Sequence, residues 1–457
     1  MRNSAMRTSI PVLVLLVVLV LLGVLILPPA SAHGQSEVSE DMQTYAARAV
    51  EWLAAQQVPN AIEPDPYPTR RHLPIGYQIP RRSEEFRYIG RRSYTYDAAI
   101  AAVAFSAAGE YGRAENILLA LGRLTDESGQ LWFAYNTNNA WPNEEDSGGA
   151  VVRTGTVAWA GYAGTFYLRM TADRPVAPAD RRIRDRILDL ARRTARYVTD
   201  RQITDSGDPR YGLATGGHGS YELEVNEEGD VVEVYDPAEL SWTSVEHNID
   251  AYFLLRDLYH LTGEETYREA AAAMGEGLES LWSAEAQQLI RGVNPDRTRD
   301  EVLPLDTASW GAMFFLAREN RERAEATLEA VDRRFLIERD GHAGYIPYGN
   351  SSVYENEVIN EVYFGDPGAT WSDVAPLWME GSLGVATAHG KAGDPAAALQ
   401  IVEAMHPYRH DNGGFQYADR EVPHQFTTYR SVAATAWYVL AVAVLENQEV
   451  RRLFWSG

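Results

Sequence analysis

The sequence contains no cysteine, so no disulfide can contribute to its stability. A chain of this length can bury a large core without cross-links, either as one large domain or as two to three smaller ones. It also lacks a linker rich in proline, glycine and serine, which favours a single domain. The packing of a core must therefore hold the fold together.

Positive charge is scarce as well. The chain has 64 acidic and 41 basic residues, a net charge of −23, and Lys391 is its only lysine. Because phosphate binding needs a positive field, nucleic acid and anionic membrane surfaces are poor partners. A salt-tolerant or high-GC source would explain the same composition equally well. The charge balance thus excludes partners without identifying a substrate.

Spacings typical of metal ligands are also absent. The histidines form no HxH or HExxH pattern, and there is no cysteine to assist them. His247 is therefore interpreted as a hydrogen-bonding or core residue rather than a metal ligand. We expect neither a metal nor another cofactor.

Residues 1–32 have the features of a secretory signal peptide. Arg2 and Arg7 precede an apolar run at 10–27, which leads into Pro28-Pro29-Ala30-Ser31-Ala32. This pattern predicts cleavage after Ala32 and one catalytic domain over 33–457. Since the run is slightly long for a signal, an uncleaved membrane anchor is the alternative. In either case the remaining chain is expected to be secreted, periplasmic or anchored outside the cytoplasm.

Segments with helical patterns of two kinds alternate between residues 42 and 446. Amphipathic segments, such as 180–200 with Ile183 and Ile187 on one face, predict outer helices with one side in water. Segments that are apolar on nearly every face predict an inner ring. Outer helices are expected near 42–57, 111–124, 180–200, 264–282, 320–336 and 394–406. Inner helices are expected at 98–108, 157–170, 251–261, 309–317, 381–388 and 432–445.

The connections between these segments alternate in length. Short turns such as Gly109-Glu110 and Thr262-Gly263-Glu264 follow the inner helices, whereas long loops precede them. The pattern predicts an all-α (α/α)6 toroid of six helical hairpins, with every long loop on one face. Long loops in a globular domain are usually functional, so we expect the binding site on that face.

The long loops carry many aromatic residues beside asparagine and aspartate. Flat aromatic faces next to amide and carboxylate groups suit sugar rings, which present apolar C–H faces and a rim of hydroxyls. We predict that Trp132, Trp141, Tyr211 or Trp371 supplies a sugar platform. For any one of them, packing of its loop is the alternative explanation.

Carboxylates open four of the six predicted inner helices, namely Asp97, Glu246, Asp306 and Glu380. Capping or a favourable interaction with the helix dipole would explain any one of them. Four that converge in a ring indicate acid–base chemistry instead. Asp250 lies one turn after Glu246 and shares its helix face.

Motifs along residues 42–446 resemble the six-hairpin glycosidase superfamily, and in particular its exported bacterial members. They are Tyr96-Asp97, Gly129-Gln130-Leu131-Trp132, Tyr135-Asn136, Glu246-His247-Asn248-Ile249-Asp250-Ala251-Tyr252, Leu305-Asp306-Thr307, Ser309-Trp310-Gly311, Trp378, Glu380-Gly381 and Ala433-Ala434-Thr435-Ala436-Trp437-Tyr438. The resemblance implies the (α/α)6 toroid but not one reaction, because the same toroid hosts polysaccharide lyases and sugar epimerases. The chain departs from the pattern at Val157-Ala158-Trp159, which leaves that inner helix without an acid, and at Ser244, where threonine is usual.

We therefore expect a monomeric enzyme that hydrolyses glycosidic bonds in an oligo- or polysaccharide. Two carboxyl groups suffice for this reaction, and the resemblance implies activation of water with inversion. Glu246 is expected to be the acid and Asp97 or Asp306 the base, with Glu380 as the next candidate for either role. Residues expected to bind substrate are Tyr96, Trp132, Trp141, His247, Asp250, Trp310, Trp371, Tyr429 and Arg430.

Two other functions fit the same residues. In a lyase or epimerase, a tyrosine or histidine would abstract a sugar proton while Arg430 neutralises a neighbouring carboxylate. In a hydrolase, Arg430 would read a uronic acid or balance the carboxylate ring. A non-catalytic carbohydrate-binding or scaffold protein would keep the toroid and the aromatic residues without a working acid–base pair.

Overall fold

The computed structural model describes residues 38–59, 70–137, 151–174, 178–226, 229–350, 357–423 and 425–456. They belong to one unit of the chain, Val38–Gly457. The predicted signal peptide at 1–32 and the predicted sugar platform Trp141 lie outside the described residues. No helix within the described ranges is both long enough and apolar enough to cross a membrane.

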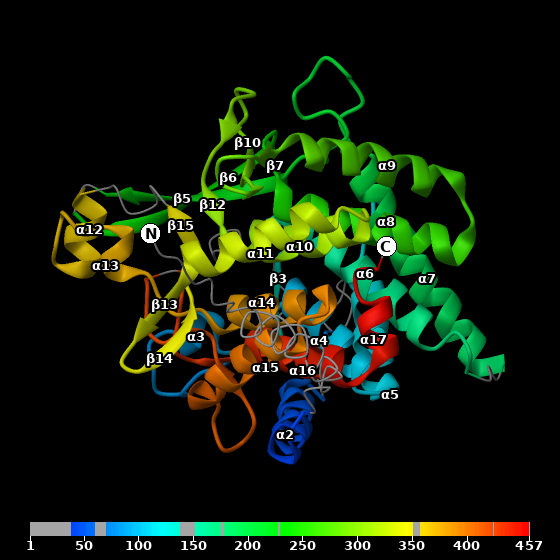
Figure 1. Cartoon of the computed structure of the whole chain (residues 1–457), viewed down its shortest axis with the longest axis horizontal. Coiled ribbons are helices and arrows are strands. Elements are labelled where there is room, and N and C mark those ends of the chain that lie inside the picture. Colours follow the sequence, from blue (N-terminus) through cyan, green and yellow to red (C-terminus); the bar gives the residue numbers. More distant parts are fainter. Residues whose placement is uncertain are drawn as a thin grey trace, which may run out of the picture. The chain divides into compact units, whose positions relative to one another are not determined.

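The main helices alternate along the chain between an outer and an inner ring, which confirms the predicted toroid (Figure 1). The outer helices are α2 (Glu40–Gln56), α5 (Tyr111–Leu124), α7 (Pro178–Thr199), α9 (Glu265–Ser280), α11 (Arg321–Phe335) and α15 (Pro395–Ala404). The inner helices are α4 (Thr95–Ala107), α6 (Thr154–Met170), α8 (Val245–Thr262), α10 (Leu305–Ala317), α14 (Met379–Ala392) and α16 (Val432–Glu446). Each inner helix packs against the next in this order, and α16 packs against α4 to close the ring.

Each inner helix forms a hairpin with an outer helix. Five inner helices pack on the outer helix that follows them, whereas α16 packs on α2, the first helix of the ring. Glycines with positive φ end three of the inner helices, at Gly109 (79°), Gly263 (70°) and Gly393 (91°). A left-handed residue stops a helix at once, so the connections on this end, the turn face, stay short.

Short antiparallel strands hold the opposite ends of the inner helices on the loop face. The pairs are β2 (Arg92–Tyr94) with β3 (Ala134–Asn136), β4 (Val152–Arg153) with β5 (Gly217–Val225), β7 (Thr243–Ser244) with β10 (Gly292–Val293), β12 (Leu303–Pro304) with β15 (Tyr348–Asn350), and β17 (Arg430–Ser431) with β1 (Tyr77–Gln78) and β16 (Phe415–Gln416). Before α14 a single bridge joins Trp378 to Ala418. Each inner helix therefore begins beside a strand or bridge that fixes its first turn.

The loops contain further elements that periodicity did not predict. The longest is an antiparallel ribbon of β5 and β6 (Val231–Leu240). The others are α3 (Phe86–Ile89), α12 (Glu357–Phe364), α13 (Trp371–Val374), α17 (Gln448–Leu453), the 3-10 turn η1 (His406–Tyr408), β8 (Trp282–Ser283), β9 (Gln288–Leu289), β11 (Arg299–Asp300), β13 (Leu336–Arg339) and β14 (His342–Tyr345). In Figure 1, β12 to β15 lie toward the left of the view and α17 lies toward the right.

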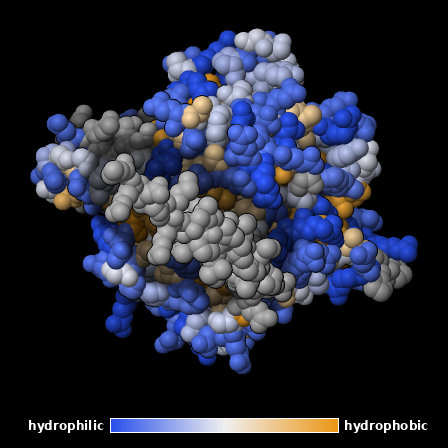
Figure 2. All heavy atoms as spheres, in the orientation of Figure 1, coloured by the Kyte–Doolittle hydropathy of each residue, from blue (hydrophilic) through white to orange (hydrophobic). Residues whose placement is uncertain are grey.

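The core lies inside and between the two rings. Inner helices such as α4 and α16 are buried along nearly their whole length by small and apolar residues. Large aromatic side chains fill the centre, among them Trp159, Trp437 and Trp455. Figure 2 shows hydrophilic side chains over most of the described surface in that view. The ring therefore has an apolar interior, and polar groups inside it need a specific explanation.

Candidate active site

Equivalent positions of the inner helices carry the acidic side chains. Glu246, Asp306 and Glu380 are each the second residue of their helix, and Tyr96 holds that position in α4. The same position is Gly155 in α6 and Ala433 in α16, neither of which carries an acid. Asp97 follows Tyr96 directly. The residues at these six equivalent positions form one layer on the loop face.

Capping does not account for these carboxylates. The N-cap positions of the four helices are held by other residues, Tyr94, Ser244, Pro304 and Trp378. In α8 the Ser244 hydroxyl accepts the backbone N–H of His247 at 3.4 Å and so caps the helix. Glu246 is thus available for another role.

The carboxyl groups lie within electrostatic reach of one another. Burial raises the pKa of Glu246 to about 7 and that of Glu380 to about 8, and the charge of Glu246 adds to the second shift. Burial followed by the charges of Glu246 and Glu380 raises the pKa of Asp306 well above its usual range. The pKa of Asp97 is raised by burial and then by Glu380. No described arginine or lysine opposes these shifts, so the cluster retains protons near neutral pH.

Glu246 and Asp306 keep some accessible surface, whereas Glu380 and Asp97 are each only 5% exposed. Asp97 packs tightly, since a Cβ added to Gly76 would lie 2.3 Å from its Oδ2. Of the four carboxylates, Glu246 and Asp306 are therefore the easiest for a substrate to reach.

A chain of hydrogen bonds fixes the orientation of Glu380. The indole Nε1 of Trp437 donates to the Tyr96 hydroxyl at 2.7 Å, and that hydroxyl donates to Glu380 Oε1 at 2.5 Å. Because a donor favours the ionised carboxylate, this bond lowers the Glu380 pKa against the larger effect of burial. The sequence predicted a subsite role for Tyr96 but named Trp437 only as part of a motif, with no role in the site.

Asp250 lies one turn deeper on α8, and neither of its carboxyl oxygens has a hydrogen-bond partner. Burial and then the charges of Glu246 and Asp306 raise its pKa well above the usual range. The indole N–H of Trp159 moderates this shift. Asp250 is therefore a buried acid whose surroundings disfavour its charged form.

His247 lies against α6 rather than among the acids. Its ring packs against Gly155, where an added Cβ atom would lie only 2.4 Å from the His247 Cδ2 atom. The ring centroids of His247 and Trp242 are 5.6 Å apart. Burial, and then the positive charge of Arg153, lowers the pKa of His247 to about 3. The ring is therefore neutral, and its buried Nδ1 has no partner. Sequence reasoning missed Arg153, although it immediately precedes the second inner helix.

A layer of tryptophans lies one helical turn below the acids. Trp159, Trp310 and Trp437 come four residues after Gly155, Asp306 and Ala433 respectively. The rings of Trp310 and Trp437 are stacked with centroids 5.9 Å apart, and Trp159 meets Trp310 edge-on at 5.9 Å. Trp310 is only 3% exposed, so it forms part of the floor beneath the carboxylates.

The remaining predicted substrate-binding residues are spread over the loop face. Trp132 is half-buried and stacks on Tyr135 at 5.3 Å, while Trp371 is buried and donates through Nε1 to the carbonyl of Tyr348 at 2.6 Å. Tyr429 donates to Glu85 at 3.3 Å in an exposed position.

Arg430 lies near His410, whose pKa it helps to lower, and none of the acids described above is shifted by it. The roles of Trp132, Trp371, Tyr429 and Arg430 in substrate binding stay predictions.

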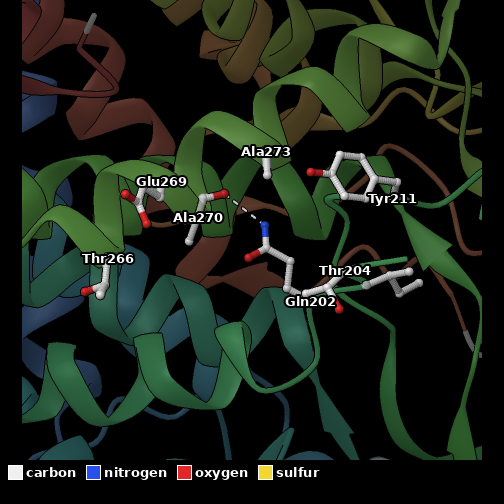
Figure 3. Close-up of a pocket in the computed structure, with 8 residues that line it drawn as sticks. Gln202, Thr204, Tyr211, Thr266, Glu269, Ala270 and Ala273 are labelled. Carbon is white, nitrogen blue, oxygen red and sulfur yellow. Dashed lines mark hydrogen bonds between the residues drawn. The ribbon is translucent and has the colours of Figure 1, made fainter. Parts of the chain in front are cut away.

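A hollow of about 320 Å³ opens elsewhere, on the outer wall of the ring (Figure 3). It lies between α9, which contributes Glu269 and Ala273, and the segment after α7, which contributes Gln202 and Tyr211. None of the carboxylates lines it. The hollow contains one acid and so lacks the pair of groups that general acid–base chemistry needs, which leaves the carboxylate layer as the candidate site.

No group of three or more histidine, aspartate or glutamate side chains within the described ranges is arranged to hold a metal ion. By sequence, the chain matches no protein-family model and no curated protein.

Solved structures do match the chain. A glycosidase variant in complex with glucose aligns with a TM-score of 0.59 and 11% identity, over 90% of this chain and 99% of that one. A GH63 mannosylglycerate hydrolase from Thermus thermophilus, also in complex with glucose, aligns at 0.54 and 16%, over 88% and 99%. The chain has the six-hairpin glycosidase fold. A D-mannose isomerase shares it at 0.53 and 12%, over 91% and 99%, so the six-hairpin fold alone does not specify the reaction.

Proposed function

We propose that the protein hydrolyses glycosidic bonds in an oligo- or polysaccharide outside the cytoplasm, with Glu246 as general acid and Glu380 as general base. The observation that carries the proposal is the pair itself. Two glutamates occupy equivalent positions on α8 and α14, and their pKa values are raised to about 7 and about 8. Glycoside hydrolysis needs one carboxyl that is protonated near neutral pH and one that is ionised.

The hydrogen bonds favour this division of roles. When Glu246 holds the proton its charge disappears, and with it one of the causes that raise the Glu380 pKa. The Tyr96 hydroxyl then stabilises the ionised Glu380. Because the pKa of Glu380, about 8, lies above that of Glu246, about 7, this division of roles depends on the Tyr96 hydrogen bond and on the greater exposure of Glu246, which leaves it within reach of a leaving oxygen.

The other acids of this layer are Asp306 and Asp97. Asp306, whose own pKa is raised by burial and then by the charges of both glutamates, is the alternative base. Asp97 is packed against Gly76 and is only 5% exposed, which makes it a weaker candidate for activating water.

The substrate class rests on the fold and the floor of the site. Similar structures are glycosidases, two of them in complex with glucose, and tryptophan faces suit the apolar side of a sugar ring. The location outside the cytoplasm rests on the signal-like residues 1–32.

Sugar isomerisation or epimerisation is the second candidate. One observation favours it: His247 is neutral, its Nδ1 has no partner, and Arg153 is near enough to affect it. An imidazole with a free ring nitrogen can take a proton from a sugar carbon, and the pKa of about 3 makes His247 a weaker base for this step than an ordinary histidine. The D-mannose isomerase that shares the fold is consistent with this chemistry.

A screen of the purified protein against a panel of polysaccharides and sugars tests both candidates. Release of reducing ends indicates hydrolysis, unsaturated-uronate absorbance indicates a lyase, and conversion of free sugars without bond cleavage indicates isomerisation. Binding without any turnover would support a non-catalytic role.

Variants then assign the residues. Glu246→Gln and Glu380→Gln should each reduce hydrolysis about 10²–10⁴-fold, because each loses a group that transfers a proton. Glu276→Gln, a matched change at an exposed position of α9, should leave the rate unchanged. Full activity in Glu246→Gln would refute its assignment as the acid.

A further inference from the structure

The segment Gln448–Ser456, here called the plug, enters the ring from the turn face. Its helix α17 packs against α6, α14 and α16. The two aromatic residues that follow, Phe454 and Trp455, are 0% and 1% exposed. They lie inside the ring, directly below the tryptophan layer. The plug is therefore part of the interior of the toroid.

Trp455 contacts several inner helices at once. Its ring stacks on Phe253 of α8 with centroids 4.9 Å apart and an interplanar angle of 5°. It also meets Trp310 of α10 at 5.2 Å and Trp159 of α6 at 5.5 Å. Its backbone N–H donates to the Tyr162 hydroxyl at 2.9 Å. One side chain thus supports two of the three tryptophans of the floor.

The only lysine of the chain holds the plug in place. The Lys391 ammonium, near the end of α14, donates to the carbonyl oxygens of Arg451, at 2.8 Å, and of Phe454. Arg451 in turn donates to the carbonyls of Val444, at 2.7 Å, and Leu445, at 2.6 Å. These bonds bring α14, α16 and the plug together at the turn face.

The charged groups that face Lys391 come from three elements. They are Arg169 of α6, Asp257 of α8 and Arg451 of the plug. Burial, and then the charge of Arg169, lowers the Lys391 pKa to about 7, while Asp257 opposes the shift.

Contacts lead from Trp455 to the carboxylate layer. Trp455 touches Trp310, Trp310 stacks on Trp437, and Trp437 donates to Tyr96, which donates to Glu380. We propose that Trp455 is a positioning residue that Lys391 holds in place. From beneath the tryptophan layer it fixes the hydrogen bonds from Trp437 through Tyr96 to Glu380. That this role serves catalysis rests on the proposed function, whereas the contacts themselves are independent of it.

The indole N–H of Trp437 reports the proposed effect without any substrate. In protein labelled with 15N-tryptophan, Trp437→Phe assigns its signal. A titration of that signal should show a midpoint near 8, the value to which the Glu380 pKa is raised. Several titratable groups interact electrostatically with Glu380. They are Tyr96 and Asp97 of α4, Glu246 of α8, Asp306 of α10, Tyr77 of β1 and Tyr417.

Removing the support should change that signal. In Trp455→Ala we expect the Trp437 resonance to move toward that of a free indole. Its midpoint should fall by about one pH unit or more, because water would replace aromatic groups beneath the site. Trp455→Phe should retain most of both properties. Arg452→Ala, an exposed change in the same helix, should change neither.

Lys391 supplies an independent measure of whether the plug is seated. Because the chain has no other lysine, an amine-acylating reagent reports this position by peptide mass spectrometry. We expect slow labelling in the parent and labelling about tenfold faster in Trp455→Ala, as for any group exposed by local opening. Lys391→Met, which removes the latch but keeps Trp455, should shift the Trp437 signal in the same direction by less. The Lys391→Met variant therefore tests the positioning role if Trp455→Ala does not fold.

The two readouts together decide the proposal. A shifted Trp437 signal in Trp455→Ala or Lys391→Met supports the positioning role, with or without faster labelling. An unchanged Trp437 signal and midpoint overturns it, above all if labelling shows that the plug has left its place. A failed hydrolysis assay would bear on the proposed function and leave this result intact.

Discussion

Asp250 and Asp257 lie on the same inner helix, two turns apart on one face, and each is 1% exposed. Asp257, toward the turn face, pairs with Arg169 and accepts a hydrogen bond from Thr165 at 3.3 Å. Asp250, toward the loop face, has no hydrogen-bond partner on either oxygen. Burial raises the pKa of both, but Arg169 and its own hydrogen bonds hold that of Asp257 to about 6, whereas Glu246 and Asp306 push that of Asp250 higher still.

The difference separates a turn face whose buried acid is paired from a loop face whose buried acids are not. A buried charge is costly unless it is paired and hydrogen-bonded, and the turn face meets that condition with Arg169. The loop face leaves its acids uncompensated, which a protein selected for stability alone would not do. Groups held at such a cost are typical of active sites, where a raised pKa is part of the chemistry.

The largest expected effect on stability comes from breaking the ion pair between Arg169 and Asp257 at the turn face. Asp257→Ala leaves the Arg169 guanidinium, only 13% exposed, without its partner. We expect a loss of about 3–5 kcal/mol in the free energy of unfolding, measured in urea. Asp185→Ala, at an exposed position of α7, should change it by less than about 0.5 kcal/mol. A loss below about 1 kcal/mol for Asp257→Ala would mean that the pair is not structural.

The acids of the loop face should make the protein less stable as pH rises. An ordinary paired carboxylate, whose pKa is lowered in the folded state, has the opposite effect. Glu246 and Glu380 have folded pKa values of about 7 and about 8 against the usual 4.5, so the folded state binds their protons more tightly than the unfolded state does. Stability should therefore fall as pH rises from about 4.5 through 8. A series of Tm measurements should show this decline in the parent and a weaker one in the Glu246→Gln, Glu380→Gln double variant. Equal slopes would contradict the raised pKa values.

The smallest effect on the free energy of unfolding is expected from a change at Asp250. Burial and then the charges of Glu246 and Asp306 raise its pKa well above the usual range and so disfavour the charged form, and asparagine has nearly the shape of the neutral acid. Asp250→Asn should therefore change the free energy of unfolding by no more than about 1 kcal/mol, far less than Asp257→Ala. A loss as large as that of Asp257→Ala would erase the distinction between the two ends.

Local patterns in the sequence predicted the ring and its loop face. The apolar inner segments, the amphipathic outer ones and the turns at Gly109, Gly263 and Gly393 depend on neighbouring residues, so they can be read from a single chain. The convergence of Glu246, Asp306 and Glu380 followed from their equivalent places at the starts of inner helices. The roles assigned to these residues stay predictions.

Contacts between distant segments could not be predicted in this way. The strand pairs on the loop face, such as β1 with β17, join residues that are far apart in the sequence. Trp455 follows the last predicted helix, and nothing local shows that it enters the ring. Arg153 stood at an inner-helix start and could have been singled out, but its effect on His247 depends on how α6 packs against α8.

The most direct test of the division into two ends measures rate and stability on the same preparation of Glu246→Gln. On a glycan that the parent hydrolyses, the rate of bond cleavage should fall about 10²–10⁴-fold. The free energy of unfolding at pH 8 should stay equal to that of the parent or rise, because an uncompensated buried acid has been removed. A variant that keeps its rate, or that loses rate and stability together, would contradict the assignment of the loop face to function.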